Sequence, residues 1–246
     1  NAGYNNQYGQ GSVYIGHDAG YSDPAGINNM YIGYRAGYST HVQDGSNLFI
    51  GAFAGENMVQ TGNNIFLGNS AGQFAESPNN IFIGLSAGSS NTSVGENVFI
   101  GNFAGLSIVG GGGSVMLGAS AGLINDGCGN TFVGTLAGAD ASSVDSSVFL
   151  GFTAGQLATR SHTLYIENST SNAPLIYGEF DTDKVEVNGS LKVNSTSGGL
   201  VLPRMTHTEA AALSPENGMM IYVTSTGGTF TTRGFWGYEE GAWIKL

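Results

Sequence analysis

The sequence predicts an all-β protein: a parallel β-roll or β-helix solenoid of about ten coils of 16–18 residues, homotrimeric, with a small β-rich tip at its C-terminus. Three observations support this prediction. A short motif recurs through the first two thirds of the chain, two apolar faces alternate within each copy, and the repeat stops before a segment of different composition.

The composition fits a folded repeat. Of 246 residues, 41 are glycine and only 10% are charged, whereas 41% are hydrophobic and 11% aromatic. Because disordered chains lack this apolar content, we expect glycine to serve tight turns. The net charge of −11 argues against binding to nucleic acid or to an anionic membrane. The uncharged stretch 106–124 is in register with the repeat, so we expect no membrane insertion.

The motif reads Asn or Ser, apolar, aromatic, aliphatic, Gly, two variable residues, Ala, Gly. Full copies run from residues 12–20 to residues 147–155, and a decayed copy follows at Leu164-Tyr165-Ile166. Only the segments between copies vary in length, which is typical of a solenoid because surface loops tolerate insertions. A helix is excluded, since two glycines in every copy would each cost about 1 kcal/mol.

The three residues before the first glycine of each copy are expected to form a strand whose side chains alternate between two faces. In residues 98–100, Val98 and Ile100 point one way and Phe99 the other. We expect the valine and isoleucine face to fill the coil, with Ala104 also inside. The leading asparagines are expected to stack as a hydrogen-bonded ladder; they are Asn29, Asn47, Asn64, Asn80, Asn97 and Asn130.

The opposite face forms a stripe of aromatic side chains interrupted by one methionine, which we call the ring stripe and predict to be the trimer interface. Its members are Tyr14, Tyr31, Phe49, Phe66, Phe82, Phe99, Met116, Phe132, Phe149 and Tyr165. Large aromatics bury about 150–250 Å² each, far more in total than the few hundred Å² that a soluble monomer usually exposes. Self-association of three identical chains about the rod axis would cover the stripe at every coil. The alternative is a monomer in which loops cover it.

The repeat resembles the heads of trimeric autotransporter adhesins, which carry a similar apolar-x-Ile-Gly-x-x-Ala pattern. It more closely resembles the Gly-rich repeats of phage tail fibres, especially those linked to Bacteroidota. The resemblance covers residues 1–167 and implies a homotrimeric, left-handed parallel β-roll. The period of 16–18 residues is longer than is usual in adhesin heads.

The rest of the chain is predicted to form two further parts. Residues 168–198 are expected to be a β neck or connector with strands at 174–180, 184–187 and 190–193. Residues 199–246 are expected to be a tip module, with a short helix after a Thr206–Glu209 capping box and a β-meander over 219–246. This tip resembles a C-terminal module of Bacteroidota surface proteins and tail fibres, matching at Leu-Pro-Arg-Met-Thr and Phe-Trp-Gly-Tyr.

Four rings of the tip are candidate receptor-binding residues: Phe235, Trp236, Tyr238 and Trp243. Aromatic residues dominate binding hot spots, and fibre tips of the resembled kind bind sugars by stacking on rings. The alternative is that these rings form the core of a module too small to be stable without them.

No catalytic or metal-binding pattern stands out. The four histidines lack metal-site spacing, and neither a phosphate-binding loop nor a nucleophile elbow occurs. We therefore expect no cofactor and no enzyme activity. A polysaccharide depolymerase with a carboxylate pair across a groove is a remote alternative.

The predicted function is that of a structural fibre protein of a phage or a phage-like contractile injection system, located outside the cell. The chain begins with Asn1 rather than Met, so we expect it to be a piece of a longer protein. Its expected partners are two further copies of itself, a baseplate or upstream fibre segment, and a cell-surface glycan or protein receptor. The alternative function is the head of a bacterial cell-surface adhesin.

Overall fold

The computed structural model describes residues 1–40, 45–58, 62–92, 94–195 and 197–246. The chain divides into two compact units, Asn1–Ser190 and Leu191–Leu246. The boundary falls inside the predicted connector at 168–198, and most of that segment belongs to the first unit.

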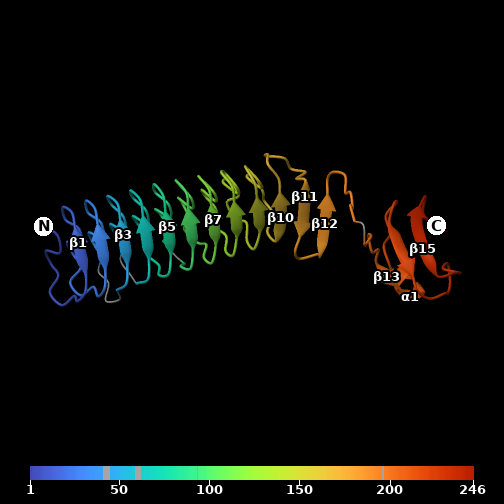
Figure 1. The fold of residues 1–246 in the computed structure, drawn as a ribbon, viewed down its shortest axis with the longest axis horizontal. Helices are drawn as coiled ribbons and strands as arrows, with labels where there is room; N and C mark the ends of the chain where they lie inside the picture. The colour runs from blue at the N-terminus through green and yellow to red at the C-terminus, as the bar shows by residue number, and fades with distance from the viewer. Residues whose placement is uncertain (41–44, 59–61, 93, 196) are drawn as a thin grey trace. The chain divides into compact units, whose positions relative to one another are not determined.

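The first unit is built on one twelve-stranded sheet whose strands lie side by side in chain order (Figure 1). The first ten strands are parallel, one per coil, and this confirms the predicted β-solenoid. They are β1 Val13–Ile15, β2 Met30–Ile32, β3 Leu48–Ile50, β4 Ile65–Leu67, β5 Ile81–Ile83, β6 Val98–Ile100, β7 Val115–Leu117, β8 Thr131–Val133, β9 Val148–Leu150 and β10 Thr163–Ile166. The last two, β11 Ile176–Glu179 and β12 Lys184–Val187, pair antiparallel and extend the sheet.

The rings of the central strand positions point into their own coils. Phe66, Phe82 and Phe99 have no exposed surface, and their rings stack with centroids 4.9 Å apart. The prediction that the ring stripe forms the trimer interface is therefore wrong. Of the ten residues of the ring stripe, Tyr14 and Tyr165 at its two ends are partly buried. The other eight are fully buried within their own chain: Tyr31, Phe49, Phe66, Phe82, Phe99, Met116, Phe132 and Phe149. The valine and isoleucine face, expected inside, points outward.

The Ala-Gly pair of the motif explains why the rings turn inward. Ala104 is fully buried, and a Cβ on Gly105 would lie 2.6 Å from the ring of Phe99. Because the Ala-Gly segment opposite the strand has almost no side-chain volume, it leaves a space inside the coil that an aromatic ring fills. The strand-ending Gly101 has φ +142°, and a Cβ there would lie 2.3 Å from the carbonyl oxygen of Gly118 in the next coil. Glycine at these two positions lets each coil close around its ring.

The predicted asparagine ladder is present and buried. The backbone N–H of Asn64 donates to Oδ1 of Asn47 (3.1 Å), that of Asn80 to Oδ1 of Asn64 (2.9 Å), and that of Asn97 to Oδ1 of Asn80 (3.0 Å). Where serine replaces asparagine the hydroxyl takes over, as at Ser114 Oγ, which accepts from the N–H of the next coil (3.1 Å). The ladder satisfies backbone donors that would otherwise be buried without partners.

The second unit is a small sheet with one short helix. Its strands are β13 Arg204–Met205, β14 Met220–Val223, β15 Gly234–Glu239 and β16 Ala242–Lys245, in that order across the sheet. Helix α1, His207–Ala211, begins with the predicted capping box: Thr206 Oγ1 accepts from the N–H of Glu209 and the Glu209 carboxylate accepts from the N–H of Thr206 (2.7 Å). The helix and meander agree with the prediction, whereas residues 190–193 form no strand.

Candidate functional site

The outward side of the first sheet is uncovered and apolar. We call its side chains the aliphatic face. They are Val13, Ile15, Met30, Ile32, Leu48, Ile50, Ile65, Leu67, Ile81, Ile83, Val98, Ile100, Val115, Leu117, Thr131, Val133, Val148, Leu150, Leu164, Ile166, Ile176, Val185 and Val187. Threonine is the most polar residue among them and none is charged. Each is partly or largely exposed, for example Ile15 at 56% and Ile100 at 38%.

The repeat ends at Glu167, which stands where the earlier coils have glycine. Its carboxylate accepts the backbone N–H groups of Asn168 (2.6 Å) and Leu175 (2.9 Å), which lowers the pKa of the carboxyl and holds the turn into β11. From there the chain continues the sheet as a hairpin instead of starting another coil.

The hairpin carries the aliphatic face two strands further. Ile166 pairs with Ile176, Ile176 pairs with Val187, and Gly178 pairs with Val185. Residues directly opposite each other in an antiparallel pair point to the same side of the sheet. Val185 is 68% exposed.

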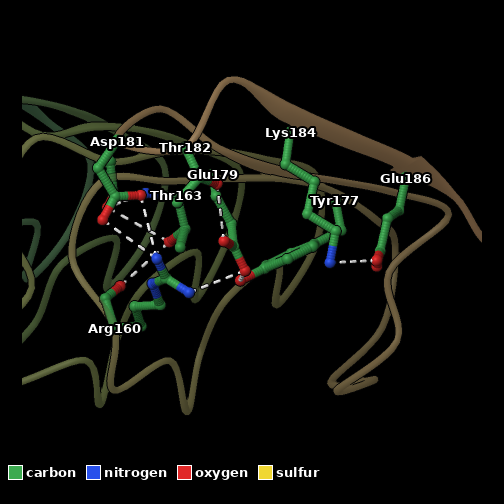
Figure 2. Close-up of polar contacts among 9 residues, drawn as sticks. Arg160, Thr163, Tyr177, Glu179, Asp181, Thr182, Lys184 and Glu186 are labelled. Atoms are coloured by element: carbon green, nitrogen blue, oxygen red, sulfur yellow. Dashed lines mark hydrogen bonds and ion pairs between the residues drawn. The ribbon is translucent and has the colours of Figure 1, made fainter. Parts of the chain in front are cut away.

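The other side of the hairpin is polar (Figure 2). Arg160, in the loop before β10, places one guanidinium nitrogen 2.8 Å from Glu179 and the other 3.0 and 3.1 Å from the two carboxylate oxygens of Asp181. Tyr177 and Thr182 donate hydroxyl hydrogen bonds to Glu179, at 3.0 and 2.9 Å. These contacts lower the pKa values of both carboxyl groups, chiefly through the Thr182 hydrogen bond at Glu179 and through Arg160 at Asp181.

This polar network closes the end of the ring stack, where the ring of Tyr165 meets that of Tyr177 edge-on at 5.3 Å. On β12, Lys184 and Glu186 form an ion pair on the polar side. In this strand, therefore, charge alternates with valine, and the valines lie on the aliphatic face.

The tip sheet has one covered side. Ile221, Val223, Phe230 and Trp236 pack with Ala210 of α1 into a small core. Trp236 is 4% exposed, and its indole N–H donates to the carbonyl of Thr232 (3.1 Å). This core fixes the orientation of β14 and β15.

Residues 179–246 match the family model of a phage tail like trimerisation region. The match begins at the end of β11 and includes β12 and the whole tip sheet. Comparisons with curated proteins and with solved structures give no match. The family match confirms the predicted resemblance to a phage tail-like trimeric fibre, and with it a structural role and the homotrimeric state.

Within the trimerisation region, the four predicted receptor-binding residues do not form one cluster. Trp236 lies in the core, as the alternative interpretation expected. Phe235 is 47% exposed on the opposite side of the sheet. Tyr238 and Trp243 are partly exposed and meet edge-to-face with centroids 5.3 Å apart across β15 and β16.

The trimerisation region also has an open apolar side that sequence reasoning missed. It carries Met220, Tyr222, Phe235 and Ile244, and the Arg204 guanidinium lies 5.2 Å from the centre of the Tyr222 ring. Met220 and Ile244 are each 46% exposed. The period-two alternation of residues 220–223, with Ile221 and Val223 inside, is the signal that could have revealed it.

Across the described ranges, no group of three or more His, Cys, Asp or Glu is placed to hold a metal ion. In the part of the chain that the structure describes, no helix is both long and apolar enough to cross a membrane. Cys128 is an exposed free thiol.

Proposed function

We propose that this chain is a segment of a phage tail-like trimeric fibre that attaches to a cell surface through its tip module. The stacked coils supply length and stiffness, and the trimerisation region joins three chains. An upstream fibre segment or a baseplate at the other end belongs to the same proposal, as does a location outside the producing cell.

The observation that carries the proposal is the Tyr238–Trp243 pair. Both rings are partly exposed at the end of β15 and the start of β16. The Trp243 ring also contacts the buried Phe230 ring at 5.5 Å, which holds it in place. A fixed, partly exposed ring offers apolar area at little entropic cost, which suits a sugar ring or an apolar protein side chain.

Trp243→Ala tests the attachment. We expect the purified variant to bind host cells at least tenfold more weakly, because hot-spot aromatics contribute about 2 kcal/mol or more. Phe235→Ala, on the opposite side of the same sheet, is the matched control and should bind normally. Sedimentation must show that both variants remain trimeric. Wild-type binding by a trimeric Trp243→Ala protein would refute attachment through this pair.

We also propose that the fibre binds its receptor without chemical conversion. The purified protein incubated with host surface polysaccharide should release no new reducing ends over hours. Release of reducing ends would revive the depolymerase hypothesis.

A further inference from the structure

We infer that the aliphatic face of β1–β12 is the surface through which three copies of the first unit pack around a common axis. The inference rests on the homotrimeric state and on the exposure of this face. It does not depend on the proposed cell attachment.

In a single chain the aliphatic face is exposed to solvent, although its residue types are those of a hydrophobic core. If its side chains expose about 40 Å² each, the face presents on the order of 900 Å², whereas the largest apolar patch on a soluble monomer covers about 300–600 Å². An area near 800 Å² per partner is typical of a stable protein–protein interface. Because the rings already fill the coil interior, the chain's own fold does not require this second apolar side.

The hairpin strengthens the inference. The strands β11 and β12 belong to a hairpin and not to a coil, so their apolar residues have no coil interior to fill. There the inner side has become polar, with Glu179, Lys184 and Glu186, yet the outer side keeps Val185 and Val187. An apolar outer side that persists where the inner side is charged points to a partner outside the chain.

The identity of that partner follows from continuity. Val185 and Val187 lie inside the segment that matches the trimerisation region, and they belong to the same sheet face as the strands of the repeat. If three chains meet at β12, a parallel arrangement brings the same strand of each chain to the same height at every coil. The occupant of the face is therefore two further copies of this chain.

Other surfaces of the coils lack this uniformity. At the second residue after the Ala-Gly pair, three successive coils carry Ser107, Ile124 and Asp140. Ile124 is 38% exposed, the same fraction as Ile100 on the aliphatic face. These two isoleucines form a matched pair, equally accessible in one chain and different only in their place on the coil.

The experiment uses the full chain carrying Cys128→Ser, which removes the native thiol, with either Ile100→Cys or Ile124→Cys. In the trimer, the thiol at position 100 should react with a maleimide at least tenfold more slowly than that at position 124. Under mild oxidation it should also form covalent dimers, since three thiols would meet at one height, whereas the thiol at 124 should not. Sedimentation and circular dichroism verify that both proteins are folded trimers.

Equal alkylation rates in folded trimers, with no covalent dimer from position 100, would overturn the inference. So would protection of position 100 that develops only when host cells or lipid vesicles are added, because the occupant would then be a receptor or a membrane. As an independent measurement, Ile100→Lys should lower the thermal midpoint of the trimer, and Ile124→Lys should not. A failed cell-binding experiment would leave these thiol rates unchanged, so the two proposals fail separately.

Discussion

Replacing Phe82 by alanine tests how each chain is stabilised. The Phe82 ring is fully buried and stacks between those of Phe66 and Phe99, with both centroid distances at 4.9 Å and interplanar angles of 4° and 6°. It also lies against Gly88, where an added Cβ would be 2.4 Å from the ring. The ring therefore has contacts above, below and on its far side.

The expected cost is about 4 kcal/mol of unfolding free energy per chain, within the 3–5 kcal/mol range for a buried Phe→Ala change. A full cost of this size is expected because the void cannot collapse. The strands on either side are fixed by the ladder bonds of Asn80 and Asn97 and by the strand pairing itself. Two ring–ring contacts, each worth about 0.5–1.5 kcal/mol, are lost together.

The assay is urea unfolding followed by far-ultraviolet circular dichroism at one fixed chain concentration, because the stability of an oligomer depends on concentration. Phe74→Ala is the control, since Phe74 is 46% exposed. It should cost less than about 1 kcal/mol. A cost of Phe82→Ala no greater than that of Phe74→Ala would show that the ring stack does not stabilise the coil, as would dissociation of the trimer without loss of coil stability.

Two further changes probe the coil backbone and the buried acid Asp23. Gly101→Ala should lower the free energy of unfolding by at least about 2 kcal/mol. Gly101 has φ +142°, which alanine rarely adopts, and the new Cβ would clash with the carbonyl oxygen of Gly118 in the next coil. Gly113→Ala, at φ +65° with nothing within 4 Å, should cost about 1 kcal/mol, and equal urea midpoints for the two variants would contradict this. Burial raises the pKa of Asp23 above its ordinary 3.8, so the native state holds the proton more tightly than the unfolded state. Stability should then fall as pH rises from 3.8 through the native pKa. Asp23→Asn should abolish this fall and raise the thermal midpoint at pH 7, and an unchanged pH profile would disprove it.

The coil pattern could be predicted from the sequence because its determinants are local. The fixed motif gives the strand, the glycines give the turns, and the leading asparagines give the ladder; all three are present in the structure. The capping box at Thr206 is equally local and was also predictable. Each of these features depends on residues a few positions apart or on strict repetition.

The sidedness of the strands could not be predicted in this way. A three-residue strand with two apolar faces satisfies alternation whichever face is inside, so Phe99 and Ile100 are equivalent by pattern alone. What decides between them is space: Ala104 and Gly105 leave a cavity that fits a ring. The alternation of charge and valine in Lys184-Val185-Glu186-Val187 also shows that the aliphatic side faces outward, but only once the register of this strand with β11 is known.

The tip could be predicted in outline and not in detail. The four candidate receptor-binding residues of the tip separate into a buried one, an exposed one and a partly exposed pair, because the strand pairing that places them is set by residues far apart in the chain. Strand alternation places Met220 on the side opposite Ile221, but which of the two sides is covered is decided by the packing of α1 and by the strand pairing.

In the fibre that we propose, each chain encloses its own rings and the three chains meet through their aliphatic faces. A side-chain-resolution electron cryomicroscopy map of the purified trimer tests it directly. The map should show Phe66, Phe82 and Phe99 stacked inside each coil and Ile81, Ile83 and their counterparts on the threefold axis. Rings on that axis, or aliphatic faces turned to solvent around it, would contradict this arrangement.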